Sequence, residues 1–401
     1  MSSKSAIGDT FRRRYMVDPK QPFNDLSLLP PKVDLESKPI LKKCISARTA
    51  LAELRLAGGL IPDPSVLIHA IPNLEAKDSS AIENIVTTHD ELYKDASGIT
   101  QESSATTKEA ARYRNALYAA VETLERLPLS ARIAVDTCRI ITGIDLDVRR
   151  TPGTTLTNTF TGEVIYTPPE GEQRLRDLLG NWENFANSSG DIDPLVRMAV
   201  LHYQFEAIHP FPDGNGRTGR ILNILSLIQD GLLDLPTLYL SRHILKTRGA
   251  YYTLLSGVTA RQEWEPWILY MLTAVEETSV WTTAKIKAIR ALMDDTTAYV
   301  RANSKLPHVV VEQIFTQTYN RIGNLVERGI AGREASAKYL RELEKLGVLE
   351  AQKEGREVIF LHRKYLDVLN NDDHQFKPYM PAEKPTAPSK RTSRAPRKKP
   401  Q

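Results

Sequence analysis

The residues best suited to chemistry lie together in one segment, residues 209–220, which reads HPFPDGNGRTGR. The residue before a proline is pushed out of the α-helical region, so His209, which precedes Pro210, is expected at the end of a helix. Gly214 and Gly216 then allow backbone conformations that bring amides close to a ligand. His209 could serve there as a general base beside a bound substrate.

The same segment predicts a site for phosphates. The next helix begins at once, and its free N–H groups and dipole attract anions. Arg217 and Arg220 lie one turn apart on one face of that helix, where cations are otherwise disfavoured. A polyphosphate bound between the two arginines and the helix N-terminus would explain why the arginines lie there. Asp213 is placed to hold a divalent cation on that polyphosphate. An ordinary turn would explain each of these residues alone. Packing does not explain why they all lie together in residues 209–220.

Two apolar helices are expected to hold this segment. Residues 194–208 (PLVRMAVLHYQFEAI) are apolar on nearly every side, as are residues 218–233, so both helices should be buried. Residues 154–167 (TTLTNTFTGEVIYT) are rich in threonine, β-branched and aromatic residues, with Thr161-Gly162 near a turn, which predicts a β-hairpin. Apolar periodicity predicts further helices at 45–58, 65–76, 79–96, 106–127, 130–142 and 173–187, and onward to about residue 300.

The chain divides into four parts on this pattern. Residues 1–105 hold a proline-rich extended arm, up to residue 43, and the first helices. Residues 106–300 form the helical core and residues 306–370 a small module. Residues 371–401 form a proline- and lysine-rich tail that is expected to be disordered. The predicted fold class is therefore mainly α.

The module at 306–370 has the layout of a winged helix-turn-helix, because helices over 313–328 and 334–346 precede a hairpin over 350–362. The hairpin is expected to turn near Gly355.

Basic residues in the second of these helices raise the question of DNA binding. Lys338, Arg341 and Lys345 share its polar side, and a DNA-binding helix needs such cations for phosphate contacts. The positive field is weakened by Glu334, Glu342 and Glu344. We therefore favour a protein-interaction or homodimer contact over DNA binding. A regulator that binds DNA or protein through this module is the alternative to an enzyme.

Composition and charge exclude several classes of protein. With 41% hydrophobic and 25% charged residues among 401, the chain is close to the average soluble globular protein. It is not a disordered polymer, a collagen-like fibre or a membrane bundle. Seven basic and no acidic residues lie in 384–401, so the formal charge of +4 becomes −3 for residues 1–383.

Targeting signals and cysteines point to the cytoplasm. The N-terminus lacks the apolar core of a secretory signal, and no stretch is long and apolar enough to span a membrane. Cys44 and Cys138 form no CxxC pattern and no zinc-ligand cluster, and we expect them to be buried thiols. A reducing compartment follows from this usage.

Residues 209–220 resemble the signature of the Fic family, HxFx(D/E)GNGRxxR, at every fixed position. The resemblance extends over the core from about Ser79 to Thr278, and the predicted hairpin is similar to the family's target-positioning flap. It implies a Fic-type helical bundle, and the arm and winged module resemble those of long, single-chain bacterial members. The matching residues are His209, Phe211, Asp213, Gly214, Asn215, Gly216, Arg217 and Arg220.

The resemblance implies a protein adenylyltransferase, which transfers AMP from ATP to a Ser, Thr or Tyr hydroxyl of a target protein or of itself. His209 would deprotonate that hydroxyl, and pyrophosphate would be released. Asp213 would bind Mg²⁺ on the α- and β-phosphates, and Arg220 would grip the γ-phosphate.

The other residues of the segment would complete the implied ATP site. Asn215 and the backbone of Gly214 and Gly216 would cradle the phosphates, and Arg217 would stabilise them. Phe211 would anchor the loop in the core. The implied site also includes Thr218 and Gly219.

A second motif, residues 79–84 (SSAIEN), matches the family's inhibitory pattern (S/T)xxxE(G/N) through Ser79 and Glu83. The resemblance implies that Glu83 pairs with Arg220 and so occupies the partner of the γ-phosphate. Ser80 and Glu83 also fit a helix capping box, in which Glu83 would only satisfy a helix N-terminus. Some members use this carboxylate to activate water and remove AMP, so a de-AMPylating hydrolase is an alternative function.

The adenine side departs from the family pattern of an asparagine followed by a tyrosine pair. Tyr251-Tyr252 fits the pair, but Thr247 stands at the asparagine position, with Lys246 beside it. We expect Thr247, Lys246 and Tyr251 to contact the nucleotide, with core packing as the alternative for the tyrosines.

Overall fold

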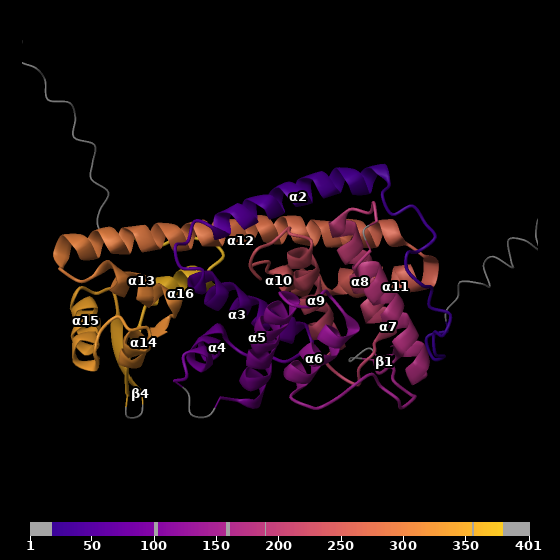
Figure 1. Cartoon of the computed structure of the whole chain (residues 1–401), viewed down its shortest axis with the longest axis horizontal. Coiled ribbons are helices and arrows are strands. Elements are labelled where there is room, and N and C mark those ends of the chain that lie inside the picture. Colours follow the sequence, from indigo (N-terminus) through magenta and orange to yellow (C-terminus); the bar gives the residue numbers. More distant parts are fainter. Residues whose placement is uncertain (1–17, 100–102, 158–160, 189, 355–356, 380–401) are drawn as a thin grey trace, which may run out of the picture.

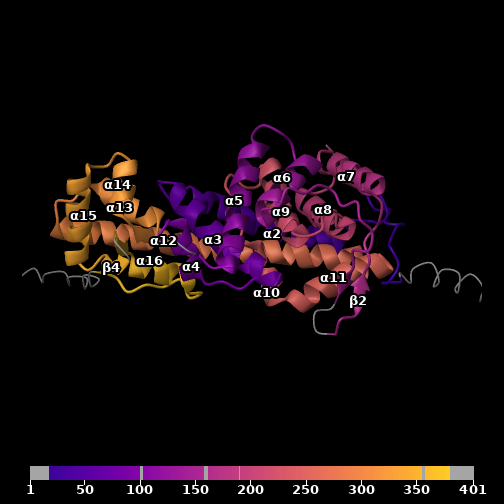
Figure 2. The same ribbon diagram turned by 90° about the horizontal axis from the view of Figure 1, so that it is seen from below.

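The computed structural model describes residues 18–99, 103–157, 161–188, 190–354 and 357–379. These residues form an elongated, mainly helical molecule (Figure 1). A 40-residue helix, α12 (Trp264–Asn303), runs along much of its length (Figures 1 and 2). Within the described residues no helix is both long and apolar enough to cross a membrane.

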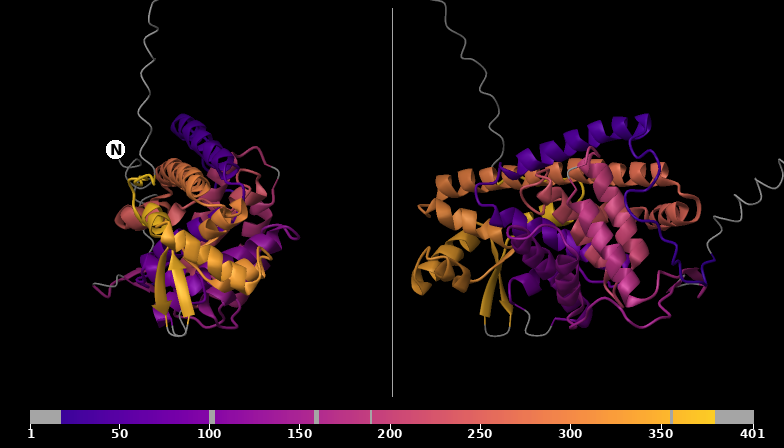
Figure 3. Two further views of the ribbon diagram at one scale, coloured as in Figure 1. Left: turned by 90° about the vertical axis from the view of Figure 1, so that its left-hand side faces the viewer. Right: turned by 45° about the vertical axis from the view of Figure 1, so that its right-hand side comes forward.

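Helix α2 (Lys38–Gly58) lies beside α12 and runs in the same direction (Figure 3). Ser46 donates to Glu276, and Arg290 donates to the carbonyl of Leu60. Pro39 at the second helical position lets α2 begin at Lys38, earlier than the predicted residue 45. The last predicted residue, Gly58, is confirmed.

The two predicted buried helices are present at the centre of the molecule. α8 (Pro194–Ile208) has the predicted bounds, with Asp193 as its N-cap. α9 (Asn215–Gln229) begins three residues earlier than predicted and ends before residue 233. The early start places Asn215, Gly216 and Arg217 in the first turn of α9. Helices α5 (Ala105–Leu124), α6 (Ala131–Thr142) and α7 (Glu172–Ala186) surround the pair (Figure 2).

The predicted hairpin is confirmed as β1 (Leu156–Thr157) and β2 (Val164–Tyr166), which pair antiparallel. Residues 158–160 lie outside the described residues. The N-terminal arm runs along the end of this hairpin, since the Phe23 amide donates to the Thr167 carbonyl over 2.9 Å. The described part of the arm, residues 18–37, contains no helix or strand and consists of turns and bends.

The break predicted between residues 76 and 79 is wrong. α3 (Ser65–Ile82) continues through it, and the next helix is α4 (His89–Ala96). The capping box belongs to Thr88 and Glu91 at the start of α4, so the alternative of a capping box at Ser80 and Glu83 is excluded. Glu83 instead follows the last turn of α3 as its C-cap.

The core is completed by two helices after α9, α10 (Leu240–Lys246) and α11 (Arg248–Arg261). Both pack against the first half of α12.

The C-terminal module contains an extra strand. A single helix over 313–328 was the prediction, but α13 (His308–Thr316) and α14 (Ile322–Glu327) are separated by β3 (Tyr319–Asn320). β3 leaves the helical path because Tyr319 and Asn320 pair with Leu361 and Phe360. The other elements are α15 (Arg333–Lys345), β4 (Glu350–Glu354), β5 (Glu357–Leu361) and α16 (Arg363–Asn370).

The predicted hairpin of the module is confirmed as β4 and β5, which extend away from α12 (Figure 3). The sheet order is β3-β5-β4. The predicted turn near Gly355 lies outside the described residues. Residues 371–379 are not the free tail that was expected, because Asp372 pairs with Arg242 and the Tyr379 amide donates to Asp295.

Candidate active site

The loop between α8 and α9 is closed by a side chain of α9. The Oδ1 of Asn215 accepts from the Phe211 amide, and its Nδ2 donates to the Phe211 carbonyl, both over 2.8 Å. Phe211 is fully buried, which confirms it as the anchor of the loop. The Asn215 side chain therefore closes the loop, and its expected contact with phosphates stays a prediction.

The three glycines in residues 209–220 are each explained by their close neighbours. Gly214 has φ +80°, and a Cβ there would lie 3.0 Å from the Cys138 sulfur. A Cβ on Gly216 would lie 2.4 Å from an oxygen of Glu83. A Cβ on Gly219 would lie 2.4 Å from an oxygen of Glu206. Side chains at the last two positions would therefore displace a carboxylate from the surface of α9.

His209 ends α8 in the left-handed conformation, with φ 47° and ψ 58°. Burial, and then the nearby guanidinium of Arg149, lower the pKa of His209 to about 4. The imidazole is therefore neutral at neutral pH. A neutral imidazole at the start of an anion-binding loop can accept a proton from a substrate.

Arg220 is fully buried and is held by the last turn of α3. Its Nε donates to the Ser79 hydroxyl over 2.8 Å, and one terminal nitrogen lies 2.9 Å from Glu83 Oε1. Burial is the largest single effect and disfavours the charged guanidinium. Glu83, with smaller effects of Tyr251, Tyr113 and Glu206, acts against burial, and together these groups raise the pKa of Arg220. The structure thus contains the ion pair that the resemblance implies, with Ser79 as a second ligand of the same arginine.

Arg217 is also buried, with 2% of its side chain exposed. It pairs with Glu109 of α5 over 2.7 Å and lies 3.6 Å from Asp213. Asp213 is 72% exposed, and its Oδ1 accepts from the Gly214 amide over 2.6 Å. A buried arginine and an exposed carboxylate therefore flank the first turn of α9.

The residues expected on the adenine side are engaged elsewhere. The Thr247 hydroxyl bonds to Tyr270, Lys246 lies 3.6 Å from Asp372, and the Tyr251 hydroxyl bonds to His202. Tyr251 is 2% exposed and belongs to the core, whereas its neighbour Tyr252 is 44% exposed.

Tyr252 is therefore the member of the pair that faces outward near the end of α3, where Glu83 lies. The guanidinium of Arg248 lies 5.9 Å from its ring centre and donates to Asn84, the residue after Glu83. Sequence periodicity could have separated the two tyrosines, because Tyr251 shares a helix face with the buried Val258.

Three further charged residues were missed by the sequence analysis. Glu109 holds Arg217, and Arg149 donates to the carbonyl of His209 over 2.9 Å. Glu206 has a buried Oε1 with no hydrogen-bond partner in the described part of the chain. Burial raises the pKa of Glu206 to about 8, with Arg220 acting against the shift. A glutamate inside an otherwise apolar helix was the one signal available for it.

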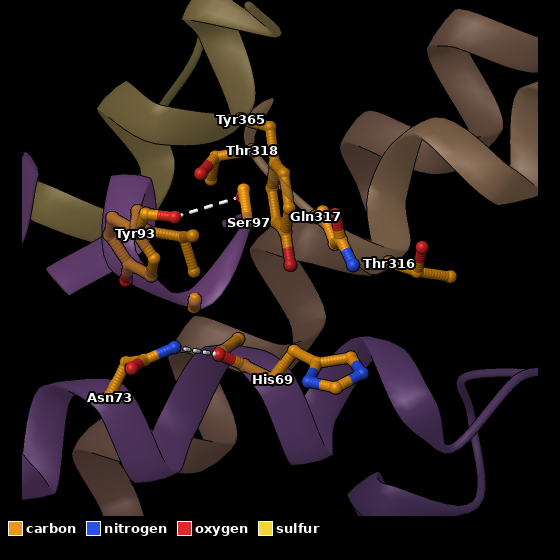
Figure 4. Close-up of a pocket in the computed structure, with 11 residues that line it drawn as sticks. His69, Asn73, Tyr93, Ser97, Thr316, Gln317, Thr318 and Tyr365 are labelled. Atoms are coloured by element: carbon orange, nitrogen blue, oxygen red, sulfur yellow. Dashed lines mark hydrogen bonds between the residues drawn. The ribbon is translucent and has the colours of Figure 1, made fainter. Parts of the chain in front are cut away.

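A small cavity of about 20 Å³ lies away from the signature, between α3, α4 and the C-terminal module (Figure 4). Figure 4 shows Tyr93, Thr318 and Tyr365 around it, opposite His69 and Asn73 of α3. Its volume suits about one water molecule, so it is not a nucleotide site.

Two family models match the amino-acid sequence. Residues 41–122 match the N-terminal region of the Fic/DOC family, and residues 292–365 match the C-terminal domain of SoFic-like protein adenylyltransferases.

Curated relatives match over shorter stretches. A protein adenylyltransferase of Caenorhabditis elegans is 36% identical over 100 residues, which are 25% of this chain and 18% of that protein. A probable protein adenylyltransferase of Aquifex aeolicus is 40% identical over 83 residues, which are 21% of this chain and 25% of that protein. The matched stretches thus span no more than 25% of these relatives' own length.

A solved structure resembles most of the molecule. A Fic family protein from Desulfovibrio desulfuricans G20 covers 85% of this chain and 98% of its own, with a TM-score of 0.51 and 18% identity. At that identity the likeness concerns the fold, and it confirms the predicted Fic-type helical bundle. The chain thus has the fold of a Fic family protein, and it matches Fic/DOC and SoFic-like models over residues 41–122 and 292–365.

Proposed function

We propose that this chain is a protein adenylyltransferase that transfers AMP from ATP to a side-chain hydroxyl of a protein and is restrained by Glu83. The observation that carries the proposal is the pairing of Glu83 with Arg220 directly over Gly216, beside the neutral His209. The names of the matched relatives support the same activity.

The phosphates of ATP bind at the first turn of α9. Free amides of a helix N-terminus and two arginines provide hydrogen bonds and positive charge, which stabilise the negative charge that develops on phosphoryl oxygens. Arg217 is fixed by Glu109 and needs no rearrangement, whereas Arg220 must exchange Glu83 for phosphate. Most of the rate enhancement then comes from positioning and electrostatics.

The proton moves to His209. The acceptor hydroxyl loses its proton to the imidazole as its oxygen bonds to the α-phosphorus, and the bond from that phosphorus to the bridging oxygen breaks. Pyrophosphate leaves with the bonding electrons. The acceptor, a Ser, Thr or Tyr of another protein or of this chain, becomes an AMP ester.

Mg²⁺ fits this site as a companion of the nucleotide. Asp213 presents an exposed carboxylate at the first turn of α9, and no group of three or more metal-binding side chains occurs within the described ranges. Mg²⁺ is usually held by one or two carboxylates and by substrate phosphates. When bound, it would neutralise phosphate charge, and Asp213 would hold it.

The test uses ATP labelled at the α- or the γ-phosphate. We expect protein-bound α-label with Glu83→Gly, much less with the unaltered chain, and none with Glu83→Gly combined with His209→Ala. Glu125→Gly is a matched control, because Glu125 is also a C-cap glutamate, at the exposed end of α5. Protein-bound γ-label would indicate a kinase and contradict the proposal.

The same labelled protein tests the hydrolase alternative. After removal of ATP, the modified Glu83→Gly protein is incubated with the unaltered chain. Release of AMP by the unaltered chain, but not by Glu83→Gly, would assign Glu83 to hydrolysis in addition to inhibition. Absence of label in every variant would favour the binding regulator.

A further inference from the structure

We propose that Arg149 is a positioning residue that fixes the backbone on both sides of His209 and so aims the imidazole at the acceptor hydroxyl. The inference rests on the proposed function, because it assumes that His209 is the base. It adds to that function a residue that lies outside the signature.

Arg149 contacts three consecutive carbonyls at the end of α8. Its Nε donates to His209 over 2.9 Å, its backbone amide donates to Pro210 over 2.9 Å, and a terminal nitrogen lies 3.5 Å from the Ile208 oxygen. The same terminal nitrogen donates to the carbonyl of Pro169, just after β2. One side chain therefore joins the catalytic loop to the base of the hairpin.

The backbone around His209 needs hydrogen-bond donors from elsewhere in the chain. The last carbonyls of a helix have no partner within it, and Pro210 removes the amide that could continue the ladder. His209 has φ 47°, which is unfavourable for a residue with a side chain. A strained conformation persists only when its surroundings hold it, and Arg149 supplies those contacts.

The charge of Arg149 bears on the imidazole as well. Arg149 is 5% exposed, and no ion pair joins it to a carboxylate within the described residues. The groups that act on His209 are Arg149, which disfavours protonation, and Glu83, Asp213 and the Glu206 carbonyl, which favour it. Burial acts in the same direction as Arg149. Removal of the guanidinium should therefore raise the pKa of His209.

The test compares Arg149→Met and Arg149→Lys with Arg150→Met, all in the Glu83→Gly background. Arg150 is a matched control, because it is the next residue, 72% exposed, and pairs with Glu172 at the surface. We measure kcat and KM for ATP in AMP transfer against pH, and the titration of His209 by NMR.

We expect Arg149→Met to lower kcat on the order of 10²-fold with little change in KM. The NMR midpoint of His209 should rise from near 4 toward its ordinary value of about 6.5, and the acid limb of kcat should follow it. Arg149→Lys keeps the charge without the branched contacts, so it should lower kcat and leave the midpoint in place. Arg150→Met should change neither.

Two results would overturn the inference. One is an unchanged kcat and an unchanged His209 midpoint in folded Arg149→Met. The other, which applies if Arg149→Met does not fold, is an Arg149→Lys protein with full kcat. The NMR titration does not depend on activity, so an inactive Glu83→Gly protein would defeat the proposed function while the effect of Arg149 on His209 stayed measurable.

Discussion

At the scale of single residues, two glycines of α9 let two carboxylates rest on one helix face. Glu83 lies over Gly216, and Glu206 lies over Gly219, one turn further along. Arg220 lies beside both, but it is paired with Glu83 only. Glu206 therefore places a second carboxyl group beside Arg220, and the ion pair between Arg220 and Glu83 is kept.

Glu206 should make the stability of the protein depend on pH. Its pKa is about 8 in the folded chain and about 4.3 when unfolded. The contribution of Glu206 to the stability of the folded chain is therefore complete below the pKa of Glu206 in the unfolded chain. This contribution is lost as the pH rises through its pKa in the folded chain. Glu206→Gln cannot ionise, so relative to the unaltered chain its melting temperature should rise by a few degrees between pH 5 and pH 8.5.

Thermal unfolding of Glu206→Gln at pH 5 and pH 8.5 checks this prediction. Glu125→Gln, a substitution at an exposed glutamate, is the control and should show no pH-dependent difference. A constant difference between Glu206→Gln and the unaltered chain at both pH values would contradict it.

At the scale of elements, the end of α3 provides both side chains that hold Arg220, Ser79 and Glu83. Ser79 and Ser80 are adjacent and fully buried. The Ser79 hydroxyl accepts from Arg220 Nε, whereas the Ser80 hydroxyl has no hydrogen-bond partner among the residues described. The two serines thus form a matched pair for a test of how α3 holds Arg220.

Ser79→Ala should destabilise the chain by about 1–3 kcal/mol, because it leaves a buried charged donor with one partner fewer. It should also raise AMP transfer, though less than Glu83→Gly, since the Glu83 ion pair remains. Ser80→Ala should change neither. Urea unfolding and α-label incorporation measure the two effects, and equal behaviour of the two variants would contradict the assignment.

The residue pattern within an element predicted most helices and hairpins well. The missed features depend on contacts between residues far apart in the sequence. α8 was predicted with its observed bounds because Pro194 and Pro210 punctuate it. β3 was predicted as helix because its strand partner, β5, begins 37 residues later, at Glu357. The signature residues were found by spacing alone. Arg149 was missed because its partner His209 lies 60 residues away in the sequence.

At the scale of the whole molecule, the C-terminal module contacts the segment that carries Glu83. Arg328 pairs with Asp63, just before α3, over 2.7 Å. Tyr319 donates to Asp90 in α4, and Arg321 donates to the Gly98 carbonyl after α4. The small cavity of Figure 4 lies in the same junction, and the hydroxyls of Tyr93 and Thr318 have no hydrogen-bond partner there among the described residues. A junction held by polar contacts around a cavity is easier to loosen than a dry apolar core.

Weakening the contacts between the C-terminal module and α3 should therefore weaken the proposed inhibition by Glu83. Arg328 and Asp63 are 43% and 26% exposed, so their pair contributes about 0.5–1 kcal/mol. If that energy holds α3 in its inhibitory position, Arg328→Met should raise AMP transfer about twofold to fivefold. Arg333→Met is the control, because Arg333 is an exposed arginine of the same module.

The decisive measurement is the combination of Arg328→Met with Glu83→Gly. If the module acts through the inhibitory contact, the double variant should transfer AMP at the rate of Glu83→Gly alone, because no inhibition remains to be weakened. A further twofold to fivefold increase in the double variant would show that the module influences catalysis by another route. An equal rise in Arg333→Met would attribute the effect to the charge of the module and not to the contact between Arg328 and Asp63.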